Sequence, residues 1–399
     1  MQFTPLDKQA RAEWRGMLHP ADGTHIGAAA ALFFFSALSL ALAHVQEVAG
    51  LYLLYAAVFY YMLTRSLGSV VILAIPGMLL FGISAMAPGL PHLYLMPAVY
   101  AALILGGVGG SFLLIHCREK KYAPLLAMPV VAYAIVAVVA SPLQGTLVLI
   151  PVALSLALGY GILNCRPQTP VLVTMAAVLA AFGVLAYLIW YYLFARVAFP
   201  APGPFTYLGT LVRDGIARVA RDAMALYAEA GVELLLSDTD IYNVGAVIGN
   251  ILPGFFLAGC GILAFLIYRT HLRVLTTWGT LSRVPLRIGA MTVSPVTAGV
   301  FLFTYLAGAL AGGGLFGTVC ENIALVLEPA LVLVGVTSLL AREAGKRSTT
   351  SRLLLVGMLV LLLNYPTLAL GVAAVVGAVR ILLAALFAAK AKGTHKDNK

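Results

Sequence analysis

The stretch CENIALVLEPALVLVG, residues 320–335, holds two carboxylates in an otherwise apolar run. Glu321 and Glu328 are seven residues apart, so they fall on one face of an α-helix. The surrounding apolar residues extend from 317 to 341, which is long enough for a helix to cross a hydrocarbon core of about 30 Å. The stretch therefore predicts a membrane-spanning helix that carries an ionisable group at depth.

The composition of the whole chain points the same way. Of its 399 residues, 62% are hydrophobic and 10% are charged, whereas soluble domains carry about 25% charged residues. The polar residues are too few to cover a globule, and this indicates a protein embedded in a lipid bilayer. The formal charge of +10 then serves to set orientation and to contact anionic lipid, so we expect no nucleic-acid partner.

Apolar runs of spanning length predict an all-α, polytopic membrane helix bundle of about 12 transmembrane helices. The expected spans are residues 26–46, 48–64, 68–88, 93–115, 123–141, 145–164, 170–195, 244–268, 291–311 and 317–341, with two more in 353–389. Proline removes a backbone donor, so Pro366 interrupts the last pair, which forms either two crossings or a short re-entrant hairpin.

The basic residues predict the orientation of these spans. With the N-terminus in the cytoplasm and alternating crossings, most of the 25 Lys and Arg fall on the inner side, in agreement with the positive-inside rule. Residues 1–25 lack the pattern of a secretory signal. We therefore expect a multi-pass protein of the bacterial cytoplasmic (inner) membrane, with a cytoplasmic N-terminal segment at 1–25 and a basic cytoplasmic tail at 390–399.

One expected outer connection is long enough to form structure of its own. Residues 197–242 separate an N-terminal transmembrane bundle, 26–196, from a C-terminal one, 243–389. Within this segment apolar residues recur at roughly helical spacing, and it holds more acidic than basic residues. This pattern predicts one or two amphipathic extracytoplasmic helices that either lie on the membrane surface or cap the bundle.

Glu328 is the strongest candidate for a functional residue. It lies about eleven residues into its span, or ~16 Å at ~1.5 Å per residue, which is near the middle of the bilayer. An ionised side chain there costs at least ~2.5–3.5 kcal/mol, so it must be protonated, paired or hydrated. Arg380, in the last apolar run, lies at a similar expected depth. We expect the two to meet, as either a structural ion pair or a substrate or proton site.

Two asparagines are weaker candidates for the same substrate-binding site. Asn250 precedes Pro253, and Asn364 precedes Pro366, so each lies where a proline can break its helix and free backbone groups. The sequence contains no GxxxxGK[ST] phosphate loop, no HExxH motif and no GxSxG elbow. Because these motifs are absent, we expect this chain to have no enzymatic activity and no cofactor. The four cysteines are widely spaced, and we expect buried free thiols.

From about residue 240 onward the order of features resembles the YybS-like family of uncharacterised bacterial membrane proteins. The resemblance is carried by GNILPGFFLAGCGILAFLIYR at 249–269, SRVPLRIG at 282–289, ENIALVLEPALVLVGVTSLL at 321–340 and NYPTLALGV at 364–372. The family is similar in architecture to the substrate-binding membrane subunits of energy-coupling-factor transporters. That similarity implies a vitamin-like solute and a separate membrane coupler with an ATPase module as partners.

Three functional hypotheses follow. The first is a transport protein, either a substrate-binding subunit or a carrier, that binds an unknown small solute at a polar site near the membrane midplane. The second is a non-transport membrane scaffold, an assembly or regulatory subunit whose buried charges are structural. The third is an enzyme acting on lipid-linked substrates, and the missing catalytic motifs disfavour it. We expect the first.

Overall fold

The computed structural model describes residues 12–14, 16–41, 96–117, 131, 135, 142–196, 203–229, 237–284, 291–311, 314–343, 357 and 366–396. Every long element among them is a helix, and the one bridge between extended segments joins Leu18 to Leu281. The chain divides into two compact units. Unit 1 comprises Met1–Gly249 and Leu263–Ala290, and unit 2 comprises Asn250–Ile262 and Met291–Lys399.

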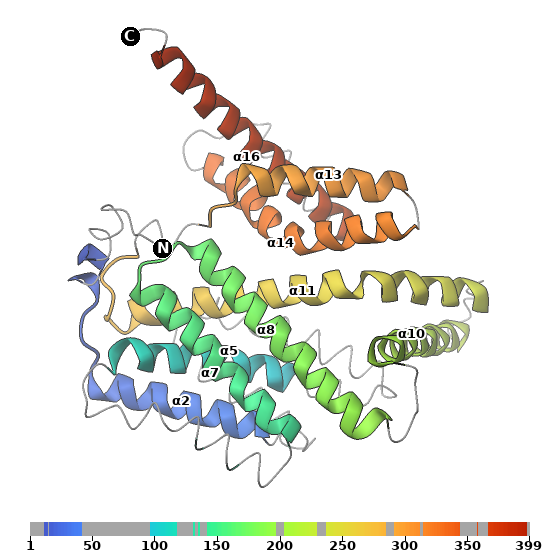
Figure 1. The fold of residues 1–399 in the computed structure, drawn as a ribbon, viewed down its shortest axis with the longest axis horizontal. Helices are drawn as coiled ribbons and strands as arrows, with labels where there is room; N and C mark the ends of the chain where they lie inside the picture. The colour runs from blue at the N-terminus through green and yellow to red at the C-terminus, as the bar shows by residue number, and fades with distance from the viewer. Residues whose placement is uncertain are drawn as a thin grey trace. The chain divides into compact units, whose positions relative to one another are not determined.

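Seven helices of the described part are long and apolar enough to cross a membrane (Figure 1). They are α2 (Gly23–Ala41), α5 (Met96–His116), α7 (Pro142–Leu163), α8 (Gln168–Trp190), α11 (Asp238–Thr277), α14 (Leu315–Glu343) and α16 (Pro366–Lys396). A shorter apolar helix, α13, covers Pro295–Ala311. The chain is therefore an all-helical, multi-pass membrane protein.

Seven of these helices coincide with expected spans, and α13 coincides with the expected span 291–311 but is shorter than a candidate crossing. Three other predicted spans, 48–64, 68–88 and 123–141, lie outside the described residues except for the helical positions 131 and 135. The first half of the expected tail pair also lies outside them, apart from residue 357. The described helices thus establish seven candidate crossings, and the count of about twelve stays a prediction.

α5 is the central helix of unit 1, in contact with both α2 and α7. The glycines of its GGVGG run, residues 106–110, face these neighbours at very short range. A Cβ on Gly109 would lie 2.8 Å from the carbonyl oxygen of Ala29 on α2, and one on Gly106 would lie 2.8 Å from Cβ of Pro151 on α7. Glycine at these positions therefore permits close helix packing.

α11 is longer than the sequence predicted. Its 40 residues span ~60 Å at ~1.5 Å per residue, about twice the thickness of a ~30 Å hydrocarbon core. We expected a span at 244–268; instead, the helix begins at Asp238 and continues to Thr277. It ends where Gly279 adopts a left-handed backbone with φ of 69°, because glycine takes that conformation without steric cost.

The expected amphipathic segment contains the helix α10, Pro204–Glu229. α10 is seen nearly end-on in Figure 1, where α8 lies along the plane of the view, so the two helices run crosswise. Tyr187 of α8 donates a hydrogen bond to the carbonyl oxygen of Pro204, which attaches the start of α10. Farther along, the Arg213 guanidinium donates to the hydroxyl of Tyr242 on α11 at 3.1 Å.

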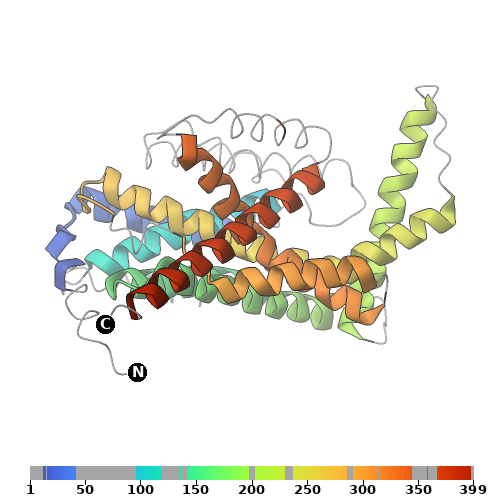
Figure 2. The ribbon, with the colours of Figure 1, turned by 90° about the horizontal axis from the view of Figure 1, so that it is seen from above.

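Unit 2 is built from α13, α14 and α16, which all pack against one another; Figure 2 shows α16, in dark red, crossing the orange helices. Its core contains Phe301, Leu331 and four alanines. Pro366 is the first residue of α16, so the expected interruption coincides with a helix start. α16 then runs unbroken to Lys396, beyond the expected end of the last span at 389.

Candidate functional site

The polar centre of unit 2 is the side-chain amide of Asn322 on α14. Its Oδ1 accepts a hydrogen bond from the backbone N–H of Gly254 at 2.6 Å, and its Nδ2 donates to the carbonyl oxygen of Asn250 at 2.9 Å. Residues 254 and 250 are the two partners of one α-helical i→i−4 hydrogen bond. The Asn322 amide therefore bridges one turn of α11 with both its donor and its acceptor.

This turn of α11 contains Pro253, which cannot donate a backbone hydrogen bond and whose ring crowds the preceding turn. In a membrane the backbone groups that a proline disturbs need polar partners from a neighbouring helix. Asn322 supplies such a partner, and Gly254 leaves room for it. A Cβ at Gly254 would lie 2.8 Å from the Asn322 Oδ1 and 3.0 Å from its Cα.

Glu328 lies six residues farther along α14, at ~9 Å of helix rise. It is half-buried, and the buried residues Ala324 and Leu331 lie four positions before it and three after it, on the same face of the helix. Pro329, inside α14, directly follows it. Among the described residues, none forms a hydrogen bond or an ion pair with the Glu328 carboxylate.

Arg380 lies on α16, the helix that packs beside α14. A Cβ on Gly335 would meet the Ala373 carbonyl, and a Cβ on Gly377 would meet the carbonyl of Leu331. These two contacts run in opposite directions along the helices, so α14 and α16 are antiparallel, and the same register places Arg380 level with Glu328. Arg380 itself is exposed, and no ion pair joins the two side chains.

Of the two asparagines predicted for the site, the structure describes Asn250 but not Asn364. Asn250 contributes its backbone carbonyl to the Asn322 bridge, while the residue is exposed. Asn364 lies outside the described residues. Sequence analysis missed Asn322, although it follows Glu321 directly in the opening stretch. The sequence feature that could have indicated Asn322 is a side-chain amide within an apolar helix. A buried amide needs a hydrogen-bond partner, as a buried carboxylate does.

Sequence analysis also missed a buried polar pair in unit 1. Ser111 of α5 and His271 of α11 are both fully buried, and their Oγ and Nδ1 atoms are 2.9 Å apart. The other ring nitrogen of His271 has no hydrogen-bond partner within the described residues. Their separation of 160 positions in the chain gave no local pattern that could have predicted the contact.

No group of three or more His, Cys, Asp or Glu side chains in the described part of the chain is arranged to hold a metal ion. The four cysteines are buried and free, as predicted. Comparison of the chain with known protein families, curated proteins and solved structures finds no match. The bridged turn and Glu328 are therefore the features from which we infer a function.

Proposed function

We propose that this protein transports a small solute across the membrane, as a carrier or as the substrate-binding subunit of a larger transporter, and that Glu328 contributes to its polar site. One observation carries the proposal: a half-buried carboxylate on an apolar span has no hydrogen-bond or ion-pair partner among the described residues. Ionisable groups inside membrane spans usually mark substrate, ion or proton pathways.

The backbone around Glu328 supports the same function. α14 contains Pro329 and α11 contains Pro253, so two neighbouring helices of unit 2 each carry an internal proline. Carriers commonly bind solutes where helices are interrupted, because freed backbone groups and helix ends can coordinate the solute. At such a point the Asn322 amide holds the Pro253 turn, because its donor and its acceptor both bind the backbone of α11.

The alternative is a membrane scaffold, an assembly or regulatory subunit in which the charges only fix helix packing. A structural role for Glu328 predicts a counter-charge that offsets its desolvation. Arg380 is level with it in the helix register but exposed, and no ion pair joins them. A carboxylate without a counter-charge among the described residues is not accounted for by packing there, so we favour transport.

Further parts of the proposal follow from the sequence. We propose about twelve crossings of a bacterial inner membrane, with both termini on the cytoplasmic side. This topology places most basic residues inside. α10 has apolar side chains such as Phe205 and Leu226 exposed to more than 60%, and its crosswise direction suits a helix on the outer membrane surface. A separate coupler with an ATPase module is the partner expected for a substrate-binding subunit.

The test is to purify the protein in mild detergent and to identify co-purifying small molecules and proteins by mass spectrometry. Wild type is expected to retain a small molecule that Glu328→Gln loses. Glu321→Gln is the matched control, because Glu321 is an exposed acid on the same helix, and it should retain the molecule.

The outcomes separate the hypotheses. A co-purifying ATPase and membrane coupler would assign the chain to a substrate-binding subunit, whereas a bound solute without these partners would assign it to a self-contained carrier. Equal retention by Glu328→Gln and wild type would refute the role of Glu328. A stable membrane complex with no solute in any variant would favour the scaffold.

A further inference from the structure

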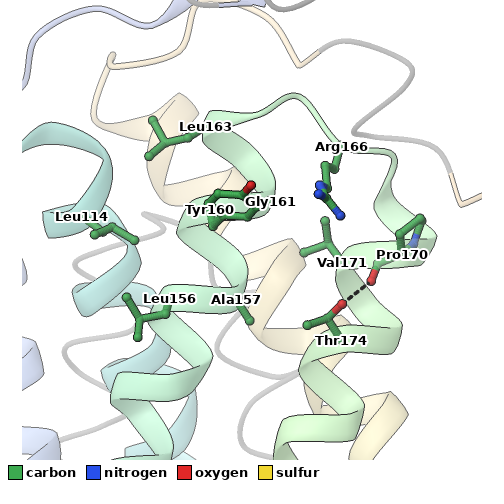
Figure 3. Close-up of a pocket in the computed structure, with 10 residues that line it drawn as sticks. All are labelled: Leu114, Leu156, Ala157, Tyr160, Gly161, Leu163, Arg166, Pro170, Val171 and Thr174. Carbon is green, nitrogen blue, oxygen red and sulfur yellow. Dashed lines mark hydrogen bonds between the residues drawn. The ribbon is translucent and has the colours of Figure 1, made fainter. Parts of the chain in front are cut away.

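A groove of about 510 Å³ opens on the surface of unit 1 between α7 and α8, with Leu114 of α5 at its side (Figure 3). Its lining is mostly apolar and includes Leu156, Ala157 and Val171. Leu156 is 55% exposed, so the groove is open at the surface of two candidate spanning helices, where we expect hydrocarbon to lie. Its shape and chemistry suit a hydrocarbon chain.

One end of the groove is cationic. Arg166 lies in the short connection between α7 and α8, at one end of these two apolar helices. Figure 3 shows it beside Tyr160 at the end of the groove opposite Leu156, and its guanidinium carbon lies 5.4 Å from the centre of the Tyr160 ring. No described residue offers the guanidinium a hydrogen bond or an ion pair.

The local backbone holds this arginine in place. α7 ends in a turn in which Cys165 adopts a left-handed conformation, with φ of 50°. The next N–H, that of Arg166, then donates to the carbonyl of Gly161 at 3.0 Å, which closes the helix end. Pro167 has its own φ fixed by the ring and restricts the backbone of the preceding Arg166, and α8 begins directly after it at Gln168. The position of Arg166 at the groove is thus built into the helix connection.

We propose that this groove binds an anionic phospholipid, with one acyl chain along the apolar lining and the headgroup phosphate at Arg166. Charge complementarity selects an anionic lipid, because the cation has no counter-ion among the described residues and guanidinium binds phosphate oxygens in pairs. The apolar lining selects a lipid over free phosphate. By the expected orientation, the α7–α8 connection faces the inner leaflet, where anionic lipids attract basic groups.

The experiment is native mass spectrometry of the purified full chain, delipidated and titrated with phosphatidylglycerol or phosphatidylcholine. Wild type should bind phosphatidylglycerol about fivefold more tightly than phosphatidylcholine, the contribution of one cation near a lipid phosphate. Arg166→Gln should abolish this preference. Arg196→Gln is the matched control, because Arg196 also lies over a tyrosine ring, at 5.7 Å from that of Tyr192, but does not line the groove; it should keep the preference.

A second variant tests the groove without changing charge. Ala157→Phe fills the space between α7 and α8 and should reduce the binding of both lipids at unchanged secondary structure. Inorganic phosphate should not displace bound phosphatidylglycerol, because it lacks the chain. The proposal is overturned if Arg166→Gln retains the wild-type preference, if Ala157→Phe binds lipid as wild type does, or if inorganic phosphate displaces the lipid.

Discussion

Gly335 of α14 and Gly377 of α16 meet backbone to backbone, and a Cβ on Gly377 would lie 2.9 Å from the Gly335 nitrogen. Around this point the carbonyls of Leu331 and Ala373 also occupy the places that added Cβ atoms would need. Such contacts allow two membrane helices to gain dispersion energy and weak Cα–H···O bonds without a hydrophobic driving force. The close contact between α14 and α16 thus requires glycine, which has no side chain, at positions 335 and 377.

Gly377→Ala is expected to separate α14 from α16. The added methyl group collides with backbone, which cannot rotate away, so overpacking should cost about 1–3 kcal/mol. The measurement is the midpoint of thermal unfolding in detergent, which should fall. Gly261→Ala is the control, because nothing lies within 4 Å of its Cβ position on α11. A Gly377→Ala midpoint equal to that of Gly261→Ala would contradict the prediction.

Asn322→Leu is expected to destabilise the Pro253 turn of α11. The buried N–H of Gly254 loses its side-chain acceptor, and an unsatisfied buried donor costs about 1–3 kcal/mol. Hydrogen exchange of a peptide covering 250–256 should become faster, while peptides from α8 exchange as before. Asn164→Leu is the control, since this exposed amide only donates to the Tyr160 carbonyl at its own helix end. Unchanged exchange at 250–256 would contradict a bridging role for Asn322.

Ser111→Ala is expected to leave the buried His271 ring without the Ser111 hydroxyl, which lies 2.9 Å from its Nδ1. The cost is again about 1–3 kcal/mol, and the midpoint of thermal unfolding should fall. Ser39→Ala removes a hydroxyl that only donates to the Phe35 carbonyl on the same helix, and it should change the midpoint little. A larger loss for Ser39→Ala than for Ser111→Ala would show that the buried pair does not stabilise unit 1.

Local patterns in the sequence predicted the spanning helices because length and hydropathy decide whether a segment crosses a membrane. They did not predict the length of α11, since its ends depend on capping by Ser237 and on Gly279 rather than on hydropathy.

The candidate site was only partly predictable. Glu328 was found because a carboxylate in an apolar run is costly wherever it lies. Its expected partner, Arg380, was placed at the right level, but the sequence could not show which face of α16 it occupies. Asn322 was missed because its function depends on the Pro253 turn, 69 positions earlier, and only the packing of α11 against α14 brings the two together.

Cys117 is expected to react slowly with maleimide in the native protein. Burial raises the pKa of its thiol, so less of the reactive thiolate is present at neutral pH than in an unfolded chain. Because a raised pKa leaves the thiol protonated at neutral pH, the labelling rate in detergent should increase as the pH rises and approach the rate of the unfolded chain. Intact mass after timed exposure to N-ethylmaleimide measures the rate, with the protein unfolded in sodium dodecyl sulfate as reference. Equal native and unfolded rates at pH 7 would contradict the burial.

The orientation can be tested with two introduced cysteines at exposed positions. Ala228→Cys lies near the end of α10, and Ser282→Cys lies after the end of α11. Because the basic residues place the second site inside, a membrane-impermeant maleimide added to intact cells should label Ala228→Cys and spare Ser282→Cys until the membrane is opened. The native thiols are all buried, so wild type gives the background. The reverse labelling pattern would invert the topology, move Arg166 to the outer leaflet and remove the positive-inside argument for the whole chain.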